Sequence, residues 1–269
     1  MDLAIDATLT SLASEMRVPN PPARMTLSSE ICPCLLDVFV CQYVYIDKAS
    51  SRFYGFKPID GANQPDSNFR ERLLSVTSAS FKFTPLAISG AWLIEPLRTA
   101  DDRGHFLRSF CAQEFTHMGL ETDFVQRSVS FNTRRGTLRG LHFQVGAYAE
   151  TKLVRCARGR IFDAIADLRP HQPTFATAFH VELDADCATM LLVPPGCAHG
   201  FLTLEDASEV YYEITPAYQP QASAGIIWSD PAFAIPWPFQ PEVISERDQM
   251  LPASADYFSK LHAGAPMRV

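Results

Sequence analysis

Long apolar runs are missing from this sequence. No stretch approaches the roughly 18 apolar residues that a membrane-spanning helix needs, and the longest run, within "CLLDVFVCQYVYI", is interrupted by Asp37 and Gln42. The N-terminal segment carries acidic residues and no basic segment ahead of an apolar run, so it does not resemble a secretory signal. We therefore expect no membrane partner and a cytoplasmic location.

Paired cysteines and an excess of positive charge are missing as well. The seven cysteines include no Cys-x-x-Cys pair of the kind that binds zinc, because the "CPC" at Cys32 and Cys34 is too tightly spaced. We therefore expect reduced thiols. The formal net charge is −7, whereas a nucleic-acid-binding surface normally shows a clustered basic excess. The charge balance thus predicts no nucleic-acid partner.

The chain changes character near Phe83. Residues 1–82 show weak periodicity throughout, and we regard them as an N-terminal extension without an assigned role. Between residues 83 and 252, short β-prone segments alternate with turn residues, which is typical of a sandwich or barrel. One helix is expected within "CAQEFTHMG", and residues 253–269 form a C-terminal tail. The pattern predicts an all-β domain, a cupin-type double-stranded β-helix (jelly roll) with a few short helices.

The strand "SEVYYEIT" assigns its two tyrosines to different faces. Side chains alternate across a strand, so Tyr212 shares a face with two aliphatic residues and Tyr211 shares the other face with two glutamates. Because the apolar face belongs in the barrel interior, we predict that Tyr212 points inward. In "LRGLHFQ", the same alternation separates Arg139 from His142, unless a bulge at Gly140 turns Arg139 back toward the interior.

One segment matches a cupin signature and another only partly matches. "VPPGCAHGF" contains Pro-x-Gly-x-x-His, ending at His199, whereas the metal-binding His-x-His signature reads His142-Phe143-Gln144 here. His142, Glu150 and His199 are too few ligands of suitable type for a convincing divalent-metal site. We therefore expect a cupin pocket without a metal, which argues against a metal-dependent dioxygenase.

Seven segments, in order, resemble those of the dTDP-4-dehydrorhamnose 3,5-epimerase family. They are "DDRGHFLRSF", "LRGLHFQ", "KLVRCARGRIFDAIADLR", "PPGCAHGFLTL", "SEVYYEITPAY", "GIIWSDPAFAIPWP" and "ISERD". The resemblance implies a metal-free and cofactor-free cupin, usually a homodimer. It also implies a substrate that is a nucleotide-diphosphate-linked 4-keto-6-deoxy sugar, and an enolate mechanism of epimerisation.

The resemblance assigns roles to four residues. His142 is the base that removes a proton next to the C4 ketone, and Asp248 orients and charges it. Lys152, ten residues after His142, stabilises the enolate oxygen, and Tyr212 returns a proton from the opposite face. One base and one acid serve both C3 and C5, so the sequence leaves open which carbon is inverted.

Residues expected to bind the nucleotide and the sugar include two that depart from the family pattern. Arg108 stands where the family has a glutamate, and Ser128 stands where it has an asparagine. Because arginine has no acceptor for thymine N3–H, the nucleotide could be another one, such as CDP. The full expected set for substrate binding is Arg103, Phe106, Arg108, Gln126, Ser128, Arg139, His199, Tyr218 and Arg247.

Two further alternatives stay open at this point. A ketoisomerase of the same cupin group would act on a similar sugar, although the presence of both Tyr212 and Asp248 favours an epimerase. A non-catalytic sugar-nucleotide-binding cupin would keep the pocket without turnover. The joint presence of His142, Lys152, Tyr212 and Asp248 argues against it.

Overall fold

The computed structural model describes the backbone of residues 75–262 and the side chains of residues 75–259. Most of the expected N-terminal extension and the end of the expected C-terminal tail therefore lie outside the described residues, as do Cys32 and Cys34. Within the described part, the expected strands and the expected helix are all present.

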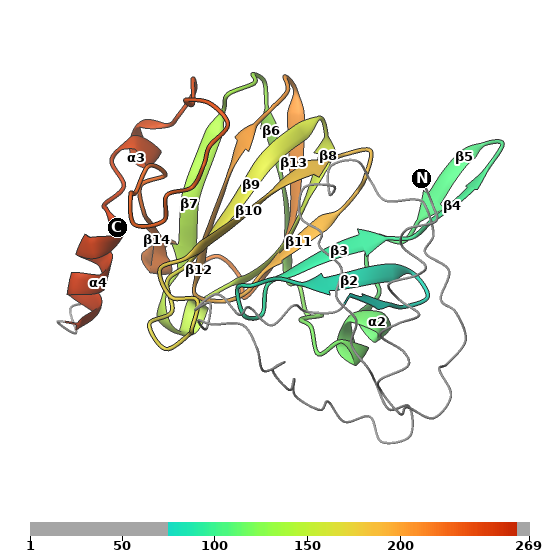
Figure 1. Ribbon diagram of the computed structural model, residues 1–269, viewed down its shortest axis with the longest axis horizontal. Coiled ribbons are helices and arrows are strands. Elements are labelled where there is room, and N and C mark those ends of the chain that lie inside the picture. The colour runs from blue at the N-terminus through green and yellow to red at the C-terminus, as the bar shows by residue number, and fades with distance from the viewer. Residues whose placement is uncertain (1–74, 263–269) are drawn as a thin grey trace, which may run out of the picture. The chain divides into compact units, whose positions relative to one another are not determined.

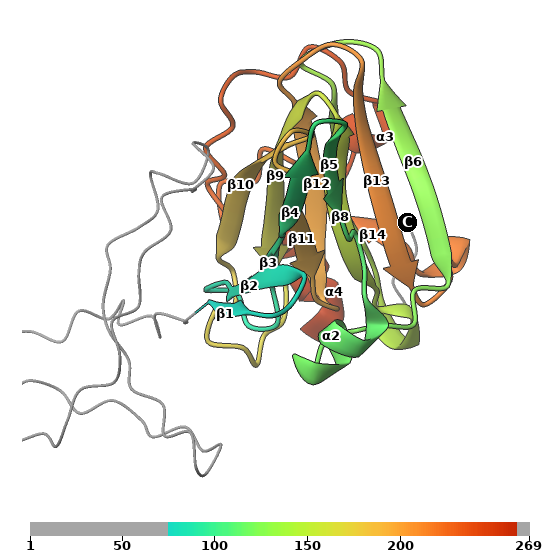
Figure 2. The same cartoon turned by 90° about the vertical axis from the view of Figure 1, so that its right-hand side faces the viewer.

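Two antiparallel sheets pack face to face (Figure 1 and Figure 2). The seven-stranded sheet consists, in spatial order, of β1 (Val76–Thr77), β2 (Phe81–Pro85), β3 (Trp92–Pro96), β11 (Met190–Val193), β8 (Thr151–Arg158), β13 (Ser208–Thr215) and β6 (Gln126–Asn132). The five-stranded sheet consists of β10 (Ala178–Asp184), β9 (Arg160–Asp167), β12 (Cys197–Thr203), β7 (Leu138–Gln144) and β14 (Ser223–Gly225). This arrangement confirms the predicted jelly roll.

The remaining elements are short. A separate hairpin of β4 (Arg98–Asp101) and β5 (Gly104–Leu107) projects away from both sheets (Figure 1). The helices are α2 (Ala112–His117), α3 (Glu246–Gln249) and α4 (Ser254–His262), with single 3-10 turns at Gly146–Tyr148 and Pro220–Ala222.

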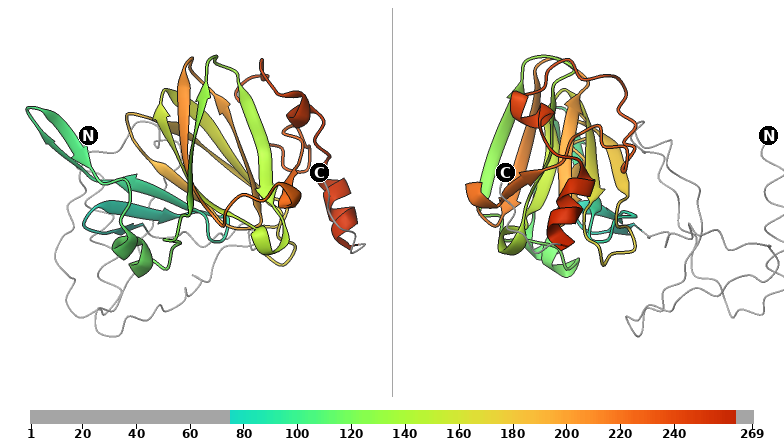
Figure 3. Two further views of the ribbon diagram at one scale, coloured as in Figure 1. Left: turned by 180° about the vertical axis from the view of Figure 1, so that it is seen from behind. Right: turned by 90° about the vertical axis from the view of Figure 1, so that its left-hand side faces the viewer.

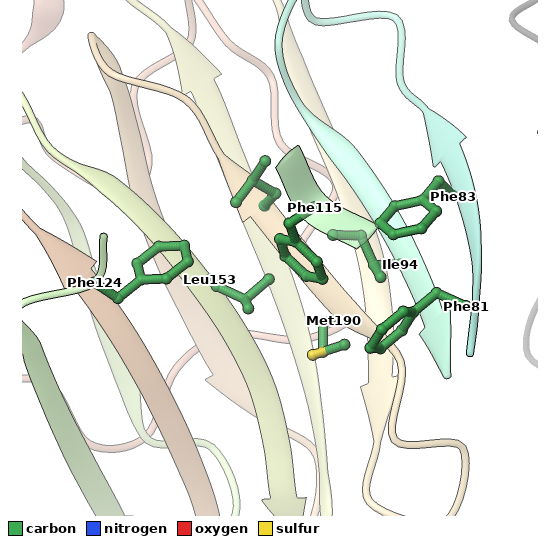
Figure 4. Close-up of a cluster of buried hydrophobic side chains, with 8 residues drawn as sticks. Phe81, Phe83, Ile94, Phe115, Phe124, Leu153 and Met190 are labelled. Atoms are coloured by element: carbon green, nitrogen blue, oxygen red, sulfur yellow. The ribbon is translucent and has the colours of Figure 1, made fainter. Parts of the chain in front are cut away.

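Helix α2 depends on tertiary packing. It has six residues and no side-chain cap at its N-terminus, and so short a helix is not stable alone in water. Its buried Phe115 meets Phe81 and Phe83 edge-on, with ring centroids 5.6 Å from each (Figure 4). Ile94, Leu153 and other apolar side chains complete this cluster. The cluster covers part of one face of the seven-stranded sheet and leaves β6 and β13 uncovered by it.

The C-terminal segment packs on the five-stranded sheet. Trp228 and Trp237 lie against a cluster that includes Leu138 and Phe162, and the ring of Tyr257 in α4 meets Phe143 in β7 edge-on, with centroids 5.1 Å apart. Both α3 and α4 consequently lie beside β7 and β14 (Figure 3). This packing brings the short helix α3 next to the middle of β7.

The described residues bear on two expectations, one about membranes and one about cysteines. Among residues 75–262, no helix is long and apolar enough to cross a membrane. Cys111, Cys156 and Cys197 are free thiols, and burial raises the pKa of Cys156 and of Cys197 to about 12. The three free thiols agree with the expectation of reduced cysteines at these positions.

Candidate active site

A cavity of about 220 Å³ lies between the two sheets. Side chains of both sheets line it. The five-stranded sheet contributes Arg139, His142, His199 and Phe201, and the seven-stranded sheet contributes Ser128, Lys152, Tyr212 and Ile214. The structure thus brings together most of the residues that the sequence nominated for catalysis, on two facing walls.

A break in strand register places Arg139 and His142 in the same cavity. His142 pairs with His199 across β7 and β12, but Arg139 pairs with Phe201, so the register shifts between these pairs. Gly140 has a φ of +128°, and a Cβ there would lie 2.5 Å from the Cα of Gly200. Only glycine suits such a conformation at so close an approach. This register shift agrees with the hypothesis of an irregularity at Gly140 that turns Arg139 toward the interior.

His142 and Asp248 form a hydrogen-bonded pair. The His142 Nε2 atom lies 2.8 Å from Oδ1 of the buried Asp248, whose Oδ2 accepts a 3.2 Å hydrogen bond from the Gly140 N–H. Burial alone would raise the pKa of Asp248, but the hydrogen bond and charge of His142, the Gly140 N–H and Arg247 outweigh it and hold the pKa below its usual value. An ionised carboxylate only accepts, so Nε2 carries the proton and Nδ1 is the basic nitrogen.

Tyr212 faces the cavity from β13, on the opposite sheet from His142. The neighbouring Tyr211 lies on the outer face, with the Arg155 guanidinium 4.9 Å from its ring centroid. Both orientations agree with the strand alternation. Burial raises the pKa of Tyr212 far above its usual value, and the Asp163 carboxylate raises it further, partly offset by Arg139. The phenol is therefore protonated at neutral pH and able to donate.

Lys152 is buried at the start of β8 and lines the same cavity. Its ammonium lies 2.8 Å from Oε1 of Glu150 and donates a 3.2 Å hydrogen bond to the carbonyl of His142. A buried charge is costly without such partners. Lys152 therefore stands beside the base as a fixed cation on the cavity wall.

Sequence reasoning missed the partner of His199. The buried Asp163 in β9 approaches His199 Nε2 with both carboxylate oxygens, at 2.8 and 3.0 Å. The available signal was an aspartate that alternates with isoleucines in "IFDAIADL", because an acidic side chain on the apolar face of a strand needs a buried partner. Asp163 orients His199 much as Asp248 orients His142.

Three other nominated residues are held by local hydrogen bonds at or near the cavity. Arg139 Nε donates to Asn132 Oδ1 at 2.8 Å, which leaves the other guanidinium N–H groups for a ligand. The Gln126 side chain accepts from the Tyr218 N–H. Arg247 donates to the Ser223 hydroxyl at 2.9 Å. Of these residues, Arg139 lines the cavity.

The comparisons with known proteins agree with this geometry. Residues 85–256 match the family model described as dTDP-4-dehydrorhamnose 3,5-epimerase. The chain belongs to the dTDP-4-dehydrorhamnose 3,5-epimerase family. The resemblance stated from the sequence, and the isomerase class that it implied, are thereby confirmed.

Members of the epimerase family align with the described domain over most of their own length. The Escherichia coli dTDP-4-dehydrorhamnose 3,5-epimerase is 42% identical over 166 residues, which are 61% of this chain and 89% of that protein. The Bacillus anthracis enzyme, solved with TDP and pyrophosphate, is 39% identical and has a TM-score of 0.63 over 65% of this chain and 99% of that one. A 3'-monoepimerase from Streptomyces bikiniensis is 31% identical, with a TM-score of 0.61 over 67% and 90%.

The nominated nucleotide-binding residues near the hairpin do not line the cavity. Arg103 pairs with Asp101 inside the β4–β5 turn, at 2.5 Å, and Phe106 is 71% exposed. Arg108, just past β5, lies 3.8 Å from Glu114 of α2. The hairpin pairs only with itself in the two-stranded sheet. In this epimerase-family chain, three candidate catalytic residues line the cavity and Asp248 is bound to one of them, whereas the nominated residues in and after the hairpin lie outside it.

The three candidate metal ligands each have a charged partner within the chain. Glu150 binds Lys152, and His142 and His199 each bind an aspartate. Within residues 75–259, no group of three His, Cys, Asp or Glu side chains is arranged to hold a metal ion. These three side chains do not fit a common metal centre.

Proposed function

We propose that this protein epimerises a dTDP-linked 4-keto-6-deoxy sugar at C3, at C5 or at both. One observation carries the proposal. The His142–Asp248 pair and the Tyr212 phenol occupy opposite walls of one cavity, with the Lys152 ammonium beside the base. Inversion of a carbon needs a base and an acid on opposite faces of the sugar ring.

The chemistry follows from the C4 ketone. Nδ1 of His142 takes a proton from the carbon next to the ketone, and the electron pair moves onto the C4 oxygen as an enolate. The Lys152 ammonium stabilises that oxygen, which is electrostatic stabilisation of developing charge. Tyr212 then gives its proton to the same carbon from the opposite face. Exchange with solvent afterwards returns a proton to Tyr212 and removes the added proton from His142. Asp248 stabilises the imidazolium that forms at His142.

The relatives support the substrate class and differ in the number of carbons inverted. The Bacillus anthracis enzyme is a 3,5-epimerase bound to TDP, and the Streptomyces bikiniensis enzyme is a 3'-monoepimerase bound to dTDP-quinovose. Both have the same fold as this chain.

Solvent deuterium incorporation tests the proposal. Wild-type protein is incubated with dTDP-4-keto-6-deoxyglucose in deuterium oxide, and NMR follows C3 and C5. We expect exchange at one or both carbons and a loss of about 10³-fold in His142→Ala, since positioned proton transfer contributes about 10²–10⁴-fold. No exchange with the dTDP sugar or with its CDP analogue would contradict the proposal.

A CDP-linked sugar is the second candidate, and Arg108 is the observation that favours it. The guanidinium suits an acceptor edge such as N3 and O2 of cytosine, or a phosphate. Calorimetric titration with dTDP, CDP, UDP and GDP separates the two candidates. A clear preference for dTDP would remove the second.

We also propose that the protein is a homodimer. The edge strand β6 exposes Val129 and Phe131, and the projecting hairpin exposes Phe106. A second copy would cover this apolar surface and would bring its hairpin to the neighbouring cavity. Sedimentation equilibrium gives the oligomeric state. A cytoplasmic location and the domain limits at residues 82 and 252 stay predictions.

A further inference from the structure

Glu150 and Lys152 are a buried ion pair at the cavity wall. They are 8% and 7% exposed, and the Lys152 Nζ atom lies 2.8 Å from Glu150 Oε1. Removing both charges from water is costly, and a buried pair often stabilises a fold no better than apolar residues would. A pair in this place therefore suggests a role beyond stability.

The ion pair and the hydrogen bond of Lys152 leave donor capacity for a ligand. An ammonium has three N–H groups. One faces Glu150 and a second faces the carbonyl of His142, 3.2 Å away. Among the described residues, no third partner is present, and the lysine lines the cavity. Because the ammonium lines the cavity, this remaining capacity is available to a substrate oxygen there.

Glu150 is itself fixed by its second oxygen. Gln144 Nε2 donates to Glu150 Oε2 at 3.0 Å, and Gln144 Oε1 accepts from the Gln219 N–H at 2.6 Å. Gln219 follows Tyr218, whose N–H is bound by Gln126. The Lys152–Glu150 ion pair and the hydrogen bonds of Gln144 therefore link the ammonium to the loop after β13.

We propose that Glu150 is a positioning residue for the reaction, acting through Lys152. It holds the ammonium so that its free N–H meets the C4 oxygen as the enolate forms, and it ties that position to the Tyr218 loop through Gln144. This inference rests on the proposed function, because it assigns Glu150 a part in stabilising that enolate.

Glu150→Gln tests the carboxylate with almost no change of volume. The amide has one oxygen and one NH₂ group, whereas the position requires two acceptors, one for Lys152 and one for Gln144. In the variant, the amide NH₂ group must therefore face one of these two donors, and that contact becomes unfavourable. We expect kcat to fall about 10²-fold, the cost of a misplaced catalytic group. KM should change less than about 3-fold, because Glu150 is not one of the side chains that line the cavity.

A matched control separates this role from general stability. Glu95 forms a more exposed pair with Lys82, at 2.7 Å, on β2 and β3, so Glu95→Gln removes a carboxylate from a Lys–Glu pair away from the cavity. We expect Glu95→Gln to leave kcat and KM within about 2-fold of wild type. If Glu150→Gln does not fold, Glu150→Asp retains the charge, shortens the side chain and carries the same kcat prediction.

A double-mutant cycle tests that Glu150 acts through Lys152. In a Lys152→Met background, Glu150→Gln should change the residual kcat less than about 2-fold, because a residue that acts only through its partner has no further effect once the partner is gone. An equal loss of kcat in the wild-type and Lys152→Met backgrounds would overturn this inference alone. An unchanged kcat in Glu150→Gln, measured beside an active wild type, would do the same. Absence of turnover in wild type would overturn the proposed function and the inference with it.

Discussion

The cavity walls and the β4–β5 hairpin hold their charged residues in opposite ways. In the cavity, His142, Lys152 and His199 each have a buried carboxylate partner within the chain. In the hairpin, Arg103 is exposed and pairs only with Asp101 of the same turn, and Phe106 is mostly exposed. The charged side chains of the cavity are thus held in place without a ligand, whereas those of the hairpin are not.

The contrast indicates which part of the function belongs to one chain. Pre-organised charges of the kind seen in the cavity stabilise developing charge without rearrangement, so the proposed chemistry needs no second subunit. The exposed hairpin has no such surroundings. In the homodimer that we propose, these hairpin residues would serve the nucleotide site of the other copy.

The largest effect on kcat is expected from a substitution among the paired charges of the cavity. Asp248→Asn keeps the size of the side chain but removes the charge that orients and stabilises His142. We expect kcat to fall on the order of 10²-fold, with dTDP affinity changed less than about 3-fold, in steady-state assays and calorimetry. A wild-type kcat in this variant would contradict the assigned role of the pair.

A smaller effect is expected from the hairpin, and co-expression assigns it to a subunit. The combined change Phe106→Ala with Arg108→Ala should weaken nucleotide binding about 10-fold, roughly 1.4 kcal/mol. When this variant is co-expressed with His142→Ala, mixed dimers should regain tight binding in the active cavity. Failure of mixed dimers to recover would place the hairpin on its own chain's site.

The smallest effect is expected on stability at low pH. The pKa of Asp248 in the folded protein lies below its usual value, which is about 3.9 in unfolded chains. Its contribution is therefore present above that value and is lost as the pH falls through the lower folded pKa. The difference in unfolding free energy between wild type and Asp248→Asn should shrink below about pH 4 in urea titrations. A difference that stays constant from pH 7 to pH 3 would contradict this.

Much of the site could be predicted from the sequence because strands impose simple geometry. Alternation alone was enough to place Tyr212 inside and Tyr211 outside. Arg139 needed a bulge, and the glycine that allows it is visible in "LRGLHFQ". Such inferences depend only on neighbours along the chain.

The remainder depends on contacts between distant segments. Asp248 reaches His142 only because the C-terminal segment packs across the five-stranded sheet, and strand patterns contain no information on that path; the family resemblance supplied it. Asp163 could be recognised in the sequence as an acidic residue on an apolar strand face, but its partner, His199, is 36 residues away along the chain. The role proposed for Glu150 had no sequence signal, because it depends on an ion pair with Lys152 and on a hydrogen bond to Gln144, which in turn binds the Gln219 N–H.

The most direct test of the proposed mechanism measures exchange and inversion in the same sample of Tyr212→Phe. In that mechanism, the base lies on one wall of the cavity and the acid on the other. Without the phenol, His142 should still remove a proton and return a deuteron to the same face, so the substrate gains deuterium while inversion falls at least about 10²-fold relative to exchange. NMR of the recovered sugar in deuterium oxide reports both. Inversion that keeps pace with exchange would contradict the placement of the acid at Tyr212.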